Sequence, residues 1–114
     1  MINTREQRYA AKIHDQVESV KDEGFKDDYR NMSEKLPVLI RSAGLVQALH
    51  FAQTRNDGSK KLIEHLTETI GNQNLLEDAR TKPINEYIFL TEKCLLALKW
   101  YKRFSKIHLE GEEK

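Results

Sequence analysis

The sequence predicts an all-α protein, a compact bundle of five to six helices, on three observations. Apolar residues recur at steps of three and four along most of the chain, which is the spacing of one helix face. No strand-like alternation of apolar and polar residues runs for more than four positions. The chain has only five Gly and two Pro in 114 residues, fewer than a β-rich protein needs for its turns. Short polar connections between the segments favour antiparallel neighbours.

The first predicted helix covers about 4–23. Thr4 followed by Gln7 fits a capping box, and Gly24 is a natural stop. The apolar stripe of this helix consists of Ala10, Ile13, Val17 and Val20. A basic row on another face consists of Arg5, Arg8 and Lys12.

The middle of the chain contains a cap signal and a proline. Asp27 or Asp28 can cap a second helix. Pro37 disfavours helix at the residue before it, so we expect a kink or break there, with a new helix that starts near Leu36 and covers 36–51. That segment is strongly apolar and should be mostly buried. Gly44 lies inside it at a cost in helix stability, which close approach of a neighbouring helix would explain.

The second half of the chain contains three further helical segments. After an Asn-Asp-Gly turn signal, Asp57 or Ser59 can cap a helix that ends at Gly71. A short helical piece follows at 75–79, and the proline of the Thr-Lys-Pro segment 81–83 then opens the last helix.

The last helix, best seen over 87–108, has two faces of different character. Its apolar face consists of Tyr87, Leu90, Cys94, Ala97, Tyr101 and Phe104. Its basic face consists of Lys99, Lys102, Arg103 and Lys106. Between 93 and 109 the chain has five basic residues and no carboxylate, although its net charge is only +1. A local basic face on a near-neutral chain suggests a defined contact with a polyanion, and a merely solvated helix face is the alternative.

No pattern in the chain indicates catalysis. The four histidines have no His or Cys partner at the spacing of a helical metal site; they are His14, His50, His65 and His108. There is no phosphate-binding loop and no nucleophile motif. The lone Cys94 excludes an internal disulfide and should be a small buried hydrophobe. We therefore expect no enzyme activity, no metal and no cofactor.

Length and hydropathy indicate a single cytoplasmic domain. We expect one helical domain over 1–109 and an acidic flexible tail over 110–114. The start of the chain is polar and charged, unlike a signal peptide. No apolar run approaches the ~20 residues that span a bilayer.

Binding is the remaining function, and the basic face is its main candidate. Its charges recur over about 10 Å of helix, so they can contact successive phosphates. Tyr101 and Phe104 belong to the apolar face and Trp100 lies at its edge, so base stacking is disfavoured and weak sequence specificity is expected. Arg8, Lys12 and Arg41 are further candidate contacts on other segments.

Three segments together resemble one family. They are Gln7-x-Tyr9-Ala10, the LP-x-LI-x-x-AGL-x-QAL segment at 36–49, and the LT-x-x-x-L-x-AL-x-WYKRF segment at 90–104. Their order and spacing are similar to those of the small subunit of the Cmr (type III-B CRISPR) effector complex. The last two strings are the specific ones.

The resemblance implies a non-catalytic helical protein of antiviral defence. Several copies of such a subunit stack along a ribonucleoprotein filament, beside RNA-cleaving backbone subunits, and support guide and target RNA through basic side chains. The residues that would then face RNA or a neighbouring subunit are Arg8, Lys12, Arg41, Lys99, Lys102, Arg103 and Lys106. Of these, Lys102 and Arg103 lie in a matching string, and the others rest on helix geometry. The alternative is a small helical protein–protein adaptor with no direct contact to nucleic acid.

Overall fold

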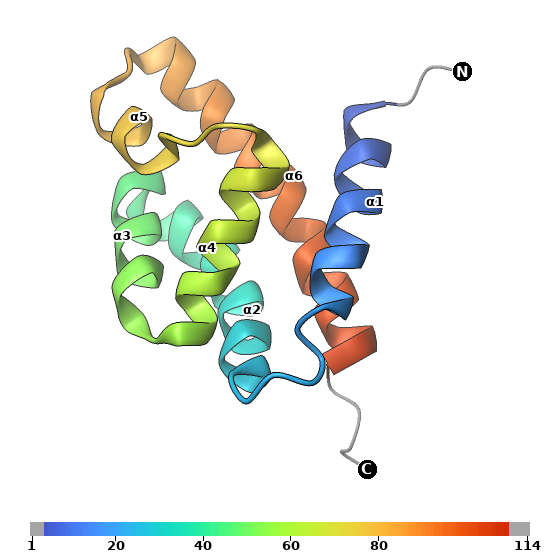
Figure 1. Cartoon of the computed structure of the whole chain (residues 1–114). Coiled ribbons are helices and arrows are strands. Elements are labelled where there is room, and N and C mark those ends of the chain that lie inside the picture. The colour runs from blue at the N-terminus through green and yellow to red at the C-terminus, as the bar shows by residue number, and fades with distance from the viewer. Residues whose placement is uncertain (1–3, 110–114) are drawn as a thin grey trace.

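A computed structural model describes residues 4–109, which form six α-helices and no strand (Figure 1). The helices are α1 (Arg5–Glu18), α2 (Lys26–Ala43), α3 (Leu45–Arg55), α4 (Asp57–Ile70), α5 (Leu75–Thr81) and α6 (Ile84–Leu109). The expected all-α class is confirmed. The predicted acidic tail at 110–114 lies outside the described residues. Within residues 4–109, no helix combines the length and the apolar composition that a bilayer-spanning segment requires.

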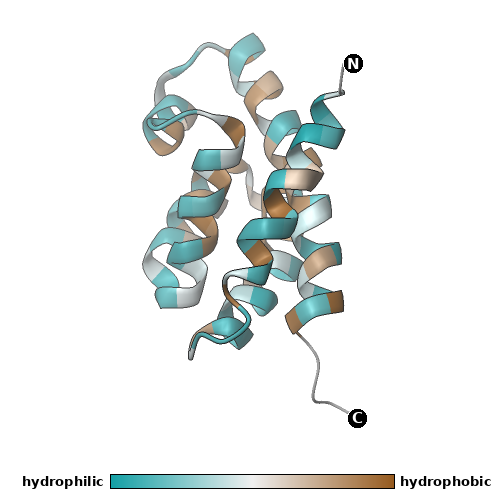
Figure 2. Ribbon diagram, turned by 45° about the vertical axis from the view of Figure 1, so that its right-hand side comes forward, coloured by the Kyte–Doolittle hydropathy of each residue, from teal (hydrophilic) through white to brown (hydrophobic). Residues whose placement is uncertain are grey.

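Helix α6 is the element around which the others are arranged. It packs against α1 on one side and against α2 and α4 on another (Figure 1). Helix α3 packs on α2 and α4, and α5 lies beside α3 and α6. Hydrophobic segments are found mainly where the helices face one another (Figure 2). The largest fully buried side chains are Tyr29, Tyr101, Ile13, Leu36, Leu45, Leu49, Leu62, Ile63, Leu66, Leu75, Leu98 and Leu109. The predicted apolar face of α6 therefore does form the core, with Phe104 and Tyr87 at its margin.

Helix α1 begins as predicted and ends early. Thr4 Oγ1 accepts a hydrogen bond from Gln7 N at 3.0 Å, and Thr4 N donates to Gln7 Oε1 at 2.8 Å, which is the capping box. The helix ends at Glu18, before Gly24. Ser19 Oγ donates to the carbonyl oxygen of Gln16 at 2.6 Å, a local side-chain bond of the kind that competes with helix continuation.

The prediction that a new helix starts near Leu36 is wrong, because α2 runs through Pro37 without a break. Pro37 removes one backbone donor from the helix, at a cost that isolated helices rarely sustain. Leu36 and Ile40 on either side of it are buried, with 0% and 4% of their surfaces exposed. Burial of this apolar face against α4 and α6 keeps the helix continuous.

The chain breaks instead at Gly44, between α2 and α3. Gly44 has φ of +94°, a conformation that favours glycine. Tyr87 of α6 approaches this point: its hydroxyl oxygen accepts a hydrogen bond from Leu45 N at 2.9 Å. A Cβ added at Gly44 would lie 3.3 Å from the same oxygen. The predicted close approach is therefore present, but it stands at a break between helices rather than inside one.

Two other caps differ from the prediction. Asn56 caps α4, since its Oδ1 accepts from Ser59 N at 2.9 Å, so neither Asp57 nor Ser59 is the cap. Helix α2 begins without any side-chain cap, and its aspartates lie in the first turn. Gly71 ends α4 in the left-handed conformation, as expected.

The first turn of α4 lies directly against the start of α2. A Cβ on Gly58 would lie 2.6 Å from both the carbonyl oxygen of Phe25 and the backbone nitrogen of Tyr29. Backbone atoms cannot swing aside as a flexible side chain can. Gly58 is thus required by helix packing, although the sequence indicated only a turn.

A buried amide links three helices. Gln16 of α1 keeps only 7% of its surface exposed. Its Oε1 accepts from the hydroxyls of Tyr101 at 2.6 Å and Thr69 at 3.1 Å. Its Nε2 donates to the carbonyl oxygen of His65 at 3.2 Å and to Glu68 Oε1 at 3.1 Å. Every polar atom of this side chain is satisfied, so the amide specifies how α1, α4 and α6 meet.

His65 extends this polar cluster to α2. Its Nδ1 lies 2.7 Å from the hydroxyl oxygen of Tyr29, which is fully buried. Burial, with a smaller contribution from the nearby charge of Lys61, lowers the pKa of His65 to about 4. The neutral ring can then accept the hydrogen bond from Tyr29 at Nδ1.

We predict that Gly58→Ala destabilises the fold by about 3 kcal/mol, because the new methyl group overlaps backbone of α2. Gly24→Ala is the matched control, since nothing lies within 4 Å of a Cβ there. Urea unfolding of the two variants measures the difference. Equal unfolding midpoints for both variants would contradict the proposed packing.

We also predict that acid destabilises the protein through His65. The imidazole takes up a proton near pH 6.5 in the unfolded chain but near pH 4 in the folded one. The free energy of unfolding therefore falls as pH drops from 6.5 to 4. Above pH 6.5, His65 contributes no pH dependence. The loss is below about 3 kcal/mol because the ring is only partly buried. In His65→Asn, urea midpoints measured across this range should change less with pH than in the wild type.

Candidate nucleic-acid interface

A groove between α2 and α6 gathers most of the predicted contact residues. Its volume is about 570 Å³. It is lined by Pro37, Arg41, Leu95, Lys99, Lys102, Arg103, Lys106 and Ile107. Five of these residues are basic and none is acidic. The lining positions recur at three and four residues along α6, so one stripe of that helix forms one wall.

The second wall depends on the continuity of α2. Pro37 and Arg41 are one helical turn apart on α2 and therefore share a face. Arg41 is far from the basic residues of α6 in sequence, and helix packing brings it to the same groove. The structure thus joins Arg41 to the basic face of α6, as the sequence could only suggest.

The two basic residues predicted on α1 lie elsewhere. Arg8 and Lys12 are not among the lining residues of the groove. Arg5, in the same row, has its guanidinium 5.2 Å from the centre of the Phe89 ring of α6. The candidate contacts therefore divide into one groove with five basic residues and a separate row on α1.

Lys99 is the one groove cation with an acidic partner among the described residues. Its Nζ lies 2.7 Å from Glu6 Oε2 of α1. The same carboxylate accepts a hydrogen bond from Trp100 Nε1 at 2.8 Å. These bonds, that of Lys99 first, hold the pKa of Glu6 below its usual range. Part of the charge of Lys99 is therefore neutralised.

Trp100 is held in place and does not form an open stacking platform. Its indole nitrogen donates to Glu6, and its ring lies 5.6 Å from both Lys99 Nζ and the Arg103 guanidinium carbon. It also packs at 5.5 Å against Phe104. Two cations of the chain itself therefore lie near this ring, where a stacked base would otherwise pack.

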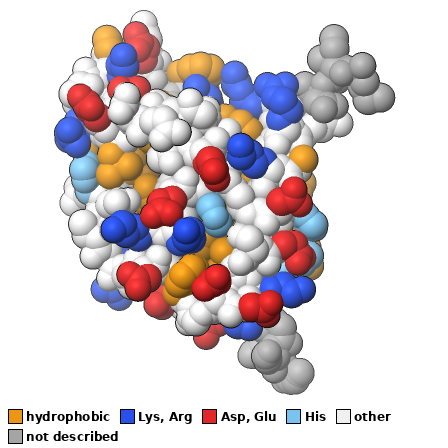
Figure 3. Space-filling model, in the orientation of Figure 1, with side chains coloured by type: hydrophobic (Ala, Val, Ile, Leu, Met, Phe, Trp, Pro, Cys, Tyr) orange, Lys and Arg blue, Asp and Glu red, His pale blue; other side chains and the backbone are white. Residues whose placement is uncertain are grey.

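The remaining groove cations keep their charge available. Within residues 4–109, Arg41, Lys102, Arg103 and Lys106 form no ion pair within 4 Å. By contrast, the face shown in Figure 3 carries acidic and basic side chains side by side. A groove lined by one sign of charge concentrates positive potential where an anionic chain can lie.

Burial favours the protonated forms of one thiol and two fully buried phenols among the described residues. Cys94 is fully buried, as predicted, and burial raises the pKa of its thiol to about 12. A thiol in that state is not a nucleophile. The protonated forms of Tyr29 and Tyr101 are likewise favoured, since burial raises the pKa of both phenols.

One group of metal-ligating side chains was missed at the level of sequence. His14 and Glu18 of α1 meet His108 at the end of α6, and their ligand atoms all lie within 4.8 Å of one another. No histidine has a His or Cys partner at helical spacing, and the available signal was the pair His14 and Glu18, four residues apart. His108 is far from that pair in the sequence, and only the folded structure shows that it lies beside them.

The fold and the groove define a small all-helical protein whose distinguishing surface is a basic groove between two helices. Comparison with protein families gives a match over residues 5–108 to the family described as CRISPR-associated protein (Cas_Cmr5). The chain belongs to the Cas_Cmr5 family.

Relatives from Thermus thermophilus agree with this assignment. The chain is 40% identical over 114 residues to the CRISPR system Cmr subunit Cmr5 of that organism, covering 96% of this chain and 99% of the relative. It also matches the crystal structure of a CRISPR-associated Cmr5 family protein from the same organism with a TM-score of 0.91. That match has 37% identity and covers 95% of this chain and 100% of the other.

Proposed function

We propose that this protein is a non-catalytic small subunit of a type III-B CRISPR (Cmr) effector complex in antiviral defence. In this role it supports guide or target RNA through the groove between α2 and α6. Membership of the Cas_Cmr5 family supports the assignment, as does the 40% identical relative named as a Cmr subunit. Its partners are the other Cmr subunits, especially the backbone subunits, and further copies of itself stacked along the filament.

The observation that carries the RNA role is the groove with five basic residues and no carboxylate. From Lys99 to Lys106 the basic residues extend over about 10 Å of helix, or about three nucleotide steps of one strand. Arg41 faces the same space from the opposite wall. A strand lying in the groove can therefore contact cations on both sides.

The chemistry of the groove favours the RNA backbone over the bases. Guanidinium and ammonium groups bind phosphate oxygens without regard to base identity. Trp100, the aromatic residue next to the groove, is already bonded to Glu6. The subunit would accordingly accept many sequences, as a complex that takes its specificity from a guide requires. Cleavage would belong to other subunits.

We predict that Lys102→Glu/Arg103→Glu weakens RNA binding by the assembled complex by at least about tenfold at low salt, because two phosphate contacts become repulsive. Lys60→Glu/Arg80→Glu is the matched control. It makes the same charge change at exposed positions of α4 and α5, outside the groove. Equilibrium RNA titration measures both. Equal affinity of the groove variant and the wild type would refute an RNA role for this face.

The dependence of affinity on salt gives a second measure from the same titrations. Each phosphate contact contributes about 0.7 to 0.9 to the slope of log affinity against log salt. Lys102→Ala/Lys106→Ala should lower that slope by the equivalent of two contacts. An unchanged slope would mean that these side chains do not contact phosphates.

The alternative is a protein–protein adaptor, and the apolar part of the groove gives it a physical basis. Pro37, Leu95 and Ile107 line the groove among the cations, and Ile107 is 61% exposed. An acidic partner with an apolar anchor would fit such a surface.

Photo-crosslinking separates the two functions. We predict that benzoylphenylalanine in place of Ile107 crosslinks to RNA in the loaded complex. The same probe in place of Ile84, which is 66% exposed at the other end of α6, serves as the control and should not. Crosslinks from position 107 to protein alone would favour the adaptor.

A further inference from the structure

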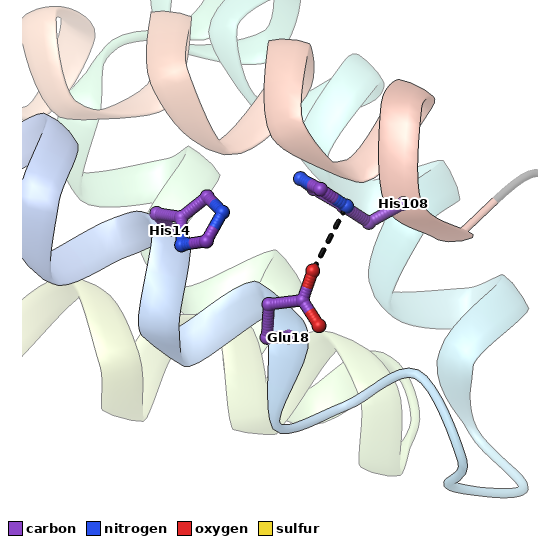
Figure 4. A group of neighbouring side chains, drawn as sticks. All are labelled: His14, Glu18 and His108. Carbon is purple, nitrogen blue, oxygen red and sulfur yellow. Dashed lines mark ion pairs between the residues drawn. The ribbon is translucent and has the colours of Figure 1, made fainter.

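The seam between α1 and the end of α6 holds three side chains that can share a metal ion. His14 and Glu18 lie one turn apart on α1, and His108 faces them from the last turn of α6 (Figure 4). His108 Nδ1 is 2.9 Å from Glu18 Oε2. One nitrogen from each imidazole and one carboxylate oxygen all lie within 4.8 Å of one another.

The surrounding residues orient both imidazoles. The His14 and His108 rings meet edge to face with centroids 5.1 Å apart. Phe104 contacts both, at 5.4 Å from His14 and 6.1 Å from His108. His14 Nδ1 lies 3.4 Å from Asp15 Oδ1, which leaves Nε2 for a metal. A carboxylate behind the second nitrogen of a histidine is the usual outer support of a metal-binding imidazole.

We propose that His14, Glu18 and His108 form a binding site for a divalent transition-metal ion of the Zn²⁺ type. Two imidazole nitrogens and one carboxylate oxygen are a ligand set that Zn²⁺ accepts. The fourth position of the ion is left to water or to a group of a neighbouring subunit. The ion would lie between His108 Nδ1 and Glu18 Oε2, in place of the direct contact that now joins them.

The geometry needs only side-chain adjustment. Ligand atoms around a tetrahedral Zn²⁺ stand about 3.3 Å apart, given bonds of about 2.0–2.1 Å. One pair is already at 2.9 Å, and the others are at most 4.8 Å apart. The His14 side chain is 46% exposed and can rotate toward the other two. Solvent also reaches Glu18 and His108, so an ion has a path to the site.

The competing explanation is that these residues form only an ion pair. His108 and Glu18 satisfy each other without a metal, and Lys21 Nζ lies 3.5 Å from Glu18 Oε1. His14 decides between the two explanations. It makes no ion pair with Glu18 among the described residues, so its removal should matter only if all three side chains hold one ion.

Calorimetric titration of the chelator-treated full-length protein with Zn²⁺ tests the proposal. We expect one ion per chain. His14→Ala, Glu18→Gln and His108→Ala should each weaken binding by at least about tenfold. His50→Ala, a histidine of α3 outside the group, should bind as the wild type does. Circular dichroism shows that each variant is folded.

Two further measurements follow the ion itself. Co²⁺ in place of Zn²⁺ should give visible absorption in the wild type that the three variants lose. Zn²⁺ should raise Tm in the wild type and in His50→Ala but not in the three variants, because an ion that binds the folded state stabilises it. The proposal would be overturned if the wild type bound no stoichiometric Zn²⁺. It would also be overturned if all three variants bound Zn²⁺ as tightly as the wild type.

Discussion

The seam between α1 and α6 is the contact on which the rest of the structure depends. Two contacts show that the helices run in the same direction: Glu6 pairs with Lys99, and further along both helices Glu18 pairs with His108. Between these two contacts, buried Gln16 of α1 accepts a hydrogen bond from the Tyr101 hydroxyl of α6 at 2.6 Å. An amide with every polar atom satisfied permits one register and penalises the others, since a slip would leave buried polar groups without partners.

This contact fixes the rotation of α6 about its own axis, and the rotation determines what each face of the helix contacts. One face enters the core, a second carries the seam with α1, and a third remains to line the groove. The groove also needs Arg41 on α2, and therefore needs α2 to continue past Pro37. The same rotation brings His108 to the side chains of α1. The proposed RNA contact and the proposed metal site thus both follow from one packing arrangement.

Local patterns allowed much of the fold to be predicted, and they failed where tertiary packing competes with them. The capping box at Thr4 and the stop at Gly71 were correct because the atoms involved are close in sequence. Pro37 was expected to kink or break the helix because a proline inside a helix is costly, yet α2 continues past it, since burial of its neighbours outweighs that cost. Gly58 looked like a turn residue, and only the approach of the α2 backbone shows its purpose.

The sequence by itself determined the helical class, the apolar stripes and the presence of a basic face on the last helix, since each depends on periodicity within one segment. Tertiary structure alone decided which basic residues share a groove, joining Arg41 to α6 and leaving Arg8 and Lys12 outside. It also decided that Lys99 is partly neutralised by Glu6 and that His14 and His108 meet. The physical reason is that these pairs are far apart in the chain, and their distances are set by helix packing, which no local spacing encodes.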